Sequence, residues 1–137
     1  MITISYREEF IKDIKELFKT ETAAYLRKEE AEELISDFFN DLIEDLYDEN
    51  EAAAEQLELN YEKIKLNGIE LGFEFIPRAI KVYLFNEKSG EKNLIDKLED
   101  DGTVYKSNKF KKALSVKVLD EYLKIAFAET LQSSLSS

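Results

Sequence analysis

The spacing of apolar residues changes from a helical period to a strand period near the middle of the chain. Within Tyr61–Asn86, apolar and polar residues alternate, as they do in strands that bury one face. Asn67 and Gly68 interrupt this alternation, and because a type I′ turn needs positive φ at both central residues, the pair predicts a two-residue hairpin loop. A loop of that length places Leu66 opposite Ile69 and sets the register of both strands.

A third strand is expected after a turn at Ile76–Ala79, which contains the one proline of the chain. The register then places Gly72 opposite Tyr83 and Glu74 beside Lys81, so we predict a three-stranded antiparallel meander. One face is apolar and should pack on helices: Ile64, Leu66, Ile69, Leu71, Phe73, Phe75, Ile80, Val82 and Leu84. The other face is mixed: Tyr61, Lys63, Lys65, Glu70, Glu74, Lys81, Tyr83 and Phe85.

Helical periodicity precedes the strands. Ser5 and Glu8 have the spacing of a capping box, which predicts a first helix from about Ser5 to Lys19. Its apolar residues recur at helical intervals and form one stripe: Phe10, Ile11, Ile14, Leu17 and Phe18. The segment from Thr20 to Leu26 fits either a loop or a short continuation, with Tyr25 and Leu26 directed at the core.

A second helix is expected from about Lys28 to Asp48. Its buried face should comprise Leu34, Ile35, Phe38, Phe39, Leu42, Ile43, Leu46 and Tyr47. The opposite face carries five carboxylates at steps of three and four residues: Asp37, Asp41, Glu44, Asp45 and Asp48. Asn50 is a suitable cap for a further short helix over residues 51–59, and the pattern leaves open whether the second helix breaks there.

Further helices are expected after the strands. Asn93–Glu99 fits a short helix, and Thr103–Tyr105 fits an extended segment. Ser107 is placed to cap a last helix that runs to about Gln132, with residues 131–137 fraying. From Val116 onward this helix is apolar on most of its circumference, so it should be central to the core or covered by a partner. The expectation is a single α+β domain, residues 1–137, in the order α-α-(α)-β-β-β-(α)-α, with the meander packed against N-terminal and C-terminal helices.

Charge narrows the range of partners. The net charge is −11, and the stretch from Glu29 to Glu58 has thirteen acidic residues and no basic one. Phosphates repel such a chain, so free nucleic acid and anionic membrane surfaces are disfavoured as partners. Arg7, Glu8 and Glu9 come before any apolar run that a signal peptide would need. No apolar stretch approaches the roughly 20 residues that span a bilayer, so the cytoplasm is the expected location.

Catalytic and metal-binding motifs are missing from the sequence. There is no cysteine and no histidine, and with four glycines there is no phosphate-binding loop. The carboxylates between Asp41 and Asp48 include pairs three and four residues apart that suit hard cations, but no calcium-loop register fits around them. We therefore predict a non-enzymatic protein without a metal or another cofactor.

The acidic helix face is the most specific surface feature of the sequence. In one interpretation, Asp37, Asp41, Glu44, Asp45 and Asp48 form a solvated face that keeps the protein soluble. In the other, they imitate nucleic-acid phosphates and occupy a basic site on a protein partner. Tyr83 and Phe85 form a second candidate, because aromatic side chains among lysines resemble a stacking platform.

These features give three functional hypotheses. The first is an inhibitor of a nucleic-acid-processing protein, of the kind that phages and mobile elements use against host defence. The second is an immunity or antitoxin-like protein that neutralises a toxin. The third is a homo-oligomeric structural or accessory protein, such as a homodimer, with the C-terminal helix at its interface. The order of helices around a three-stranded meander, with strong acidity, is similar in outline to some small phage inhibitors of CRISPR nucleases, which implies the first hypothesis by fold analogy alone.

Overall fold

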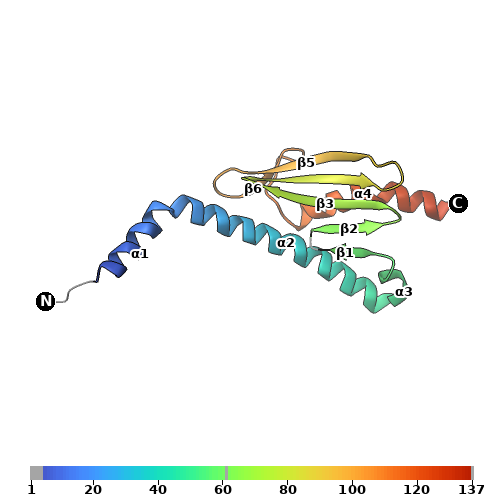
Figure 1. The fold of residues 1–137 in the computed structure, drawn as a ribbon. Helices are drawn as coiled ribbons and strands as arrows, with labels where there is room; N and C mark the ends of the chain where they lie inside the picture. The colour runs from blue at the N-terminus through green and yellow to red at the C-terminus, as the bar shows by residue number, and fades with distance from the viewer. Residues whose placement is uncertain (1–4, 61, 137) are drawn as a thin grey trace.

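The computed structural model describes residues 5–60 and 62–136 and confirms the α+β class (Figure 1). The helices are α1 (Tyr6–Leu17), α2 (Lys19–Glu49), α3 (Glu51–Ala54) and α4 (Val116–Ser136). The strands are β1 (Glu58–Asn60), β2 (Lys63–Leu66), β3 (Ile69–Ile76), β4 (Ala79–Asn86), β5 (Lys92–Asp100) and β6 (Tyr105–Ser107). Within the described residues, the prediction of three strands is wrong, because all six strands form one antiparallel sheet in sequence order.

The predicted register of the central hairpins is confirmed. Leu66 pairs with Ile69, and Asn67 and Gly68 have φ values of 52° and 80°. Gly72 lies opposite Tyr83, as expected. A Cβ atom on Gly72 would stand 2.2 Å from Cζ of Tyr83, so the ring occupies the space that any other side chain would need. Tyr61, expected on the mixed face, lies outside the described residues.

The predicted short helix over Asn93–Glu99 is wrong, because this segment belongs to β5. The pairing of β4 with β5 is irregular between Val82 and Tyr83, and a bulge of this kind breaks the regular alternation of apolar and polar positions. The bulge also lets a charged residue, Asp96, occupy a core position of the strand, where it is 6% exposed.

Both ends of the sheet also differ from the prediction. Residues 58–60, expected in a helix, form β1, and the short helix α3 ends at Ala54. Ser107, expected to cap the last helix, ends β6 instead. The last helix begins at Val116, and the hydroxyl of Ser115 accepts a hydrogen bond from the backbone N–H of Val118 at 3.4 Å.

α2 is longer than expected, α1 is slightly shorter, and both are more exposed than expected. Residues 20–26 are helical and belong to α2, which is continuous from Lys19 to Glu49. The expectation that Tyr25 and Leu26 reach the core is wrong, since they are 59% and 51% exposed. The predicted cap is present, because the Ser5 hydroxyl accepts from the Glu8 backbone N–H at 3.4 Å. α1, which the structure describes in full, buries none of its residues.

The core lies between one face of the sheet and two helices, α2 and α4. Phe73 of β3 is central, with ring centroids 5.8 Å from Phe39 of α2 and 6.0 Å from Tyr122 of α4. Ile35 of α2 and Leu119 of α4 are both fully buried in the same cluster. The apolar face predicted for the central strands is therefore the face that the helices cover.

Polar contacts attach both helices to β5. Asp96 accepts hydrogen bonds from the hydroxyl of Ser107 at 2.5 Å and from the hydroxyl of Tyr122. The backbone N–H of Lys109 donates to the same carboxylate at 3.0 Å. At the end of the strand, Arg27 of α2 donates twice to Asp100, at 2.8 and 3.0 Å. These hydrogen bonds lower the pKa of the Asp100 carboxyl below its usual value, with Arg27 as the main cause.

Candidate functional site

The five predicted carboxylates lie together on α2. Asp37, Asp41, Glu44, Asp45 and Asp48 are all exposed, and the continuous helix aligns them on the side opposite the buried residues. From the first to the last is eleven residue steps, or about 16 Å of helix. We call these five residues the acidic face.

The charge of the acidic face is not neutralised by any side chain that the structure describes. Among the described residues, every salt bridge involves other side chains, and none includes a member of the acidic face. The only acidic residue of α2 with such a partner is Glu32, whose carboxylate lies 3.8 Å from the ammonium of Lys28 in the described chain. The acidic face is therefore free to bind positive charge on another molecule.

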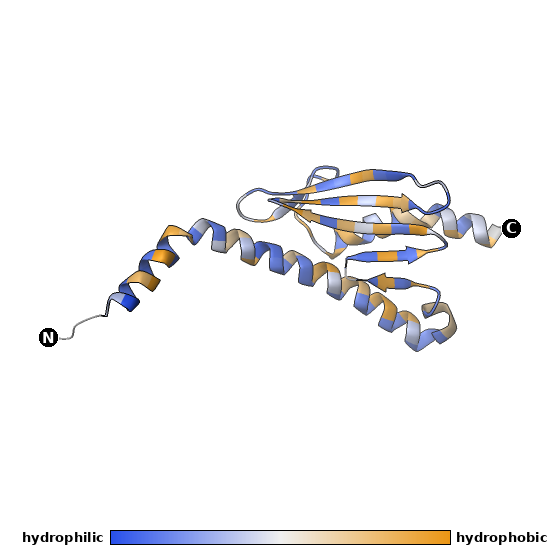
Figure 2. Cartoon of the chain, viewed as in Figure 1, coloured by the Kyte–Doolittle hydropathy of each residue, from blue (hydrophilic) through white to orange (hydrophobic). Residues whose placement is uncertain are grey.

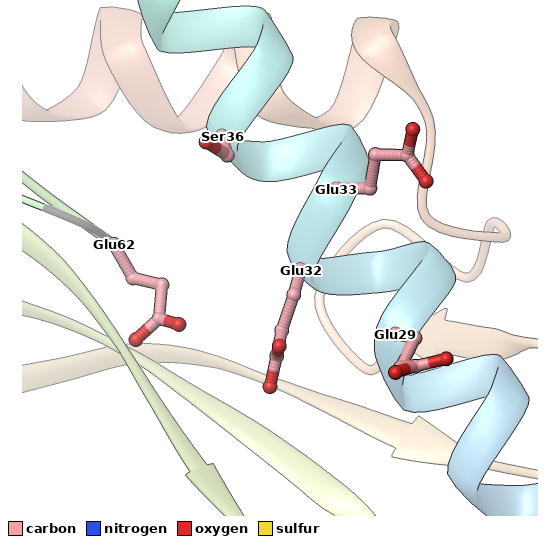
Figure 3. Close-up of a pocket in the computed structure, with 5 residues that line it drawn as sticks. All are labelled: Glu29, Glu32, Glu33, Ser36 and Glu62. Carbon is pink, nitrogen blue, oxygen red and sulfur yellow. The ribbon is translucent and has the colours of Figure 1, made fainter.

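A second group of acidic side chains lines a pocket of about 480 Å³ nearer the start of α2 (Figure 3). Glu29, Glu32, Glu33 and Ser36 come from α2, and Glu62 comes from the chain just before β2. Figure 3 shows the carboxylates of Glu32 and Glu62 directed into the space between the helix and the strands. Partial burial raises the pKa of Glu62, and the negative charge of Glu32 raises it further.

This pocket has the charge for a cation but not the geometry. In residues 5–60 and 62–136, no three acidic side chains converge as a metal site requires. The pocket therefore extends the negative surface of α2 toward its N-terminal half, and the whole helix presents carboxylates to solvent.

The other candidate pair, Tyr83 and Phe85, lies on β4. The ring of Tyr83 covers Gly72, and its hydroxyl donates to the Glu70 carboxylate at 3.2 Å. The ammonium of Lys92 lies 4.3 Å from the ring centroid. Burial, together with the charge of Glu70, raises the pKa of Tyr83 to about 12. The Tyr83 ring is only 6% exposed and is held by internal contacts, so it offers little free surface for stacking.

Two apolar surfaces are more prominent than the sequence indicated. The first is the predicted stripe of α1, here called the α1 stripe, whose members are exposed: Phe10 52%, Ile11 39%, Ile14 38%, Leu17 69% and Phe18 47%. Figure 2 shows these apolar positions recurring along a helix that projects beyond the body of the protein. The sequence predicted this stripe but gave no sign that it would lack cover.

The second apolar surface is a groove of about 710 Å³ between the end of α2 and the second half of α4. We call it the apolar groove; its apolar lining includes Leu42, Leu46, Leu57, Ile64, Leu66, Leu123, Phe127 and Leu131. The nearly all-apolar circumference of the last helix was the sequence signal for this surface. Leu131 remains 43% exposed on α4.

Comparison of the chain with family models, with curated proteins and with solved structures finds no match. In the described parts of the chain, no helix combines the length and apolarity that crossing a bilayer requires. Functional inference therefore rests on the surfaces of this chain alone.

Proposed function

We propose that the protein is a non-enzymatic binding protein whose acidic face occupies a basic, nucleic-acid-binding surface of another protein. The observation that carries this proposal is the alignment of Asp37, Asp41, Glu44, Asp45 and Asp48 on one exposed helix, with no ion pair to another described residue. Uncompensated charge on a rigid element attracts a complementary surface and accelerates encounter.

The spacing of the carboxylates supports imitation of a phosphate backbone. Five charges over about 16 Å of helix give one charge per about 4 Å. One DNA strand carries a charge per about 3.4 Å of helix axis. A basic groove that accommodates one strand would therefore meet a similar charge density on α2. An inhibitor of a nucleic-acid-processing enzyme and an antidote to a toxin with a basic active site would both use such a surface.

The test compares two variants with the same net charge. In the face variant, the five residues are changed to their amides: Asp37→Asn, Asp41→Asn, Glu44→Gln, Asp45→Asn and Asp48→Asn. In the control variant, five exposed glutamates elsewhere are changed: Glu55→Gln, Glu91→Gln, Glu99→Gln, Glu121→Gln and Glu129→Gln. Each tagged protein is used to capture partners from cells of its natural host, with circular dichroism as the check that the fold is intact.

We expect the wild type and the control variant to retain the same partner and the face variant to lose it. Duplex DNA added to the wild-type complex should release the partner, and so should added salt, because both compete for the same cationic surface. A partner that remains bound to the folded face variant would overturn the proposal. Equal loss by both variants would also overturn it, because it would show a dependence on net charge alone.

A homo-oligomeric accessory role is a second candidate function. The exposed α1 stripe and the apolar groove favour this role, because apolar surfaces of this size usually pack against another protein surface.

A further inference from the structure

The α1 stripe lacks the burial that a short helix normally requires. α1 has 12 residues, and an isolated helix of that length is marginal in water even with favourable residues. Helices of this kind gain most of their stability by packing an apolar face against something else. The five members of the stripe, from Phe10 to Phe18, are instead between 38% and 69% exposed. The sequence therefore encodes an apolar face that residues 5–60 and 62–136 leave uncovered.

The apolar groove has the complementary shape, because it is a concave surface of about 710 Å³ with a mostly apolar lining. Its lining on α4 runs from Leu123 to Leu131, which is eight residue steps or about 12 Å. The α1 stripe from Phe10 to Phe18 is also eight steps, about 12 Å of helix. The length and the apolar character of the stripe thus match those of the groove.

The stripe and groove of one chain are too far apart to meet. Phe18 alone separates α1 from α2, and α2 then continues for 31 residues, or about 46 Å. α1 is attached at the first end of this helix, whereas Leu42 and Leu46 bring the groove to the last end. Figure 1 shows α1 at the opposite side of the body from α3. An α1 helix that fills the groove must therefore come from another molecule.

Charge favours a second copy of this chain as the source. The first 28 residues contain six basic and five acidic side chains, whereas residues 29–58 contain thirteen acidic ones and no base. Bases and acids balance around the stripe, with four of each: Arg7, Lys12, Lys15 and Lys19 against Glu8, Glu9, Asp13 and Glu16. When two α2 helices lie antiparallel, the nearly neutral N-terminal arm of each copy meets the acidic half of the other, and the two acidic halves stay apart. The same arrangement places each α1 stripe beside the partner copy's groove.

We propose that two copies of the chain form a two-fold symmetric dimer in which α1 of each copy fills the apolar groove of the other. Each copy gives one helix and receives one, so the interface closes on itself and leaves no free stripe to extend a fibre. The dimer contact is made by the α1 stripe and the apolar groove, and the variants that test the two proposals alter different residues.

The first experiment uses the absence of cysteine from the chain. A chain with Ile14→Cys and a differently tagged chain with Leu131→Cys are mixed and oxidised. The proposal predicts a disulfide-linked pair that contains both tags. The matched control replaces Ile14→Cys with Lys12→Cys, which lies on the polar side of α1, and should give at least tenfold less of this product. Equal cross-linking from both positions, or none from Ile14→Cys, would overturn the proposal.

The second experiment measures mass by light scattering over a range of concentrations. The wild type should have the mass of two chains, and two variants should each have the mass of one: Ile14→Asp, which alters the stripe, and Leu131→Asp, which alters the groove. Because both side chains are 38% or more exposed in the single chain, both variants should fold, which circular dichroism will check. A wild type that remains a monomer at high concentration would overturn the proposal.

Mixing the two monomeric variants provides the sharpest outcome. The Leu131→Asp chain has an intact α1, and the Ile14→Asp chain has an intact groove, so their mixture can form one of the two contacts. We expect mixed dimers that neither variant forms alone. A mixture that stays monomeric although both variants are folded and the wild type is dimeric would show a different interface. Association of wild-type α1 with lipid vesicles in place of a second copy would likewise overturn the proposal.

Discussion

α1 and α4 are both helices with strong apolar patterns, yet α4 buries several of its apolar residues in the core and α1 leaves its apolar residues exposed. α4 buries Leu119, Tyr122 and Phe127 against the sheet and α2, whereas α1 buries nothing. The cause lies in how each helix is connected. α4 follows β6 after a short segment that returns the chain over the covered face of the sheet, whereas α1 continues almost directly into α2 and is carried away from the body. Periodicity establishes that a helix has an apolar face, and the connection decides what that face meets.

The largest expected effect is a contrast between side-chain truncations to alanine in the two helices. Leu119→Ala on α4 should lower the free energy of unfolding by about 2–5 kcal/mol, because it leaves a cavity in a packed core. Phe10→Ala on α1 should change the stability of the single chain by less than about 0.5 kcal/mol, because its side chain has few contacts to lose. Urea unfolding at concentrations low enough to keep chains separate measures both. A large loss for Phe10→Ala would show that α1 packs on its own chain and would remove the contrast.

A smaller effect tests whether polar contacts also hold α4 in place. Asp96→Asn keeps the shape of the side chain but replaces one acceptor oxygen by an amide donor, which faces the hydroxyls of Ser107 and Tyr122. The loss of charge-assisted hydrogen bonds in a buried site should cost about 1.5–3 kcal/mol in urea unfolding. Tyr122→Phe, which removes one donor and keeps the carboxylate, should cost less. An Asp96→Asn chain as stable as the wild type would mean that apolar packing alone fixes α4.

The smallest effect concerns alkaline pH. It depends on tyrosine side chains that are buried in the body of the protein, whereas α1 buries none of its residues. The pKa of Tyr83 is raised from 10.0 to about 12, first by burial and then by Glu70. Burial and its hydrogen bond to Asp96 also raise the pKa of Tyr122. A folded-state pKa above the unfolded value means that folding favours the protonated phenol, so this stabilisation is complete below pH 10 and is lost as pH rises through about 12.

Urea unfolding at pH 8, 10 and 11 should therefore show stability falling over the alkaline range. Tyr83→Phe keeps the ring over Gly72 and removes the ionisable group, so its decline should be shallower than that of the wild type. Parallel declines would show that Tyr83 does not contribute to the pH dependence.

Much of the central sheet was predictable because local chemistry determines it. Asn67 and Gly68 allow one tight turn, and that turn sets the register in which β2 pairs with the first half of β3. The close contact between Gly72 and the Tyr83 ring follows from the same register, because the two residues lie opposite each other on β3 and β4. The acidic face was predictable for a similar reason, because steps of three and four residues place side chains on one side of any helix.

β5 was not predictable from periodicity, and neither was the start of α4. The bulge opposite Val82 and Tyr83 breaks the alternation of β5, so Leu94, Ile95 and Leu98 looked helical. The sheet also accepts a carboxylate at Asp96, because hydroxyl groups far along the chain compensate its burial.

The two apolar surfaces show a different limit of sequence analysis. The members of the α1 stripe and the groove residues on α2 and α4 were identifiable as apolar residues on helices. The exposure of both surfaces depends on α2 running without a break from Lys19 to Glu49. The sequence around Leu26 did not show whether that segment is a helix or a loop.

The sequential order of the six strands bears on how quickly the chain can fold. Each strand finds its partner in the segment that immediately follows, so the sheet grows by closing short loops whose entropic cost is small. Proteins with mostly local contacts fold faster than those that join distant segments. The docking of α4 on β3 and α2 is the principal contact between remote parts of the chain, so we expect this step, and not sheet formation, to limit the rate at which the body is completed.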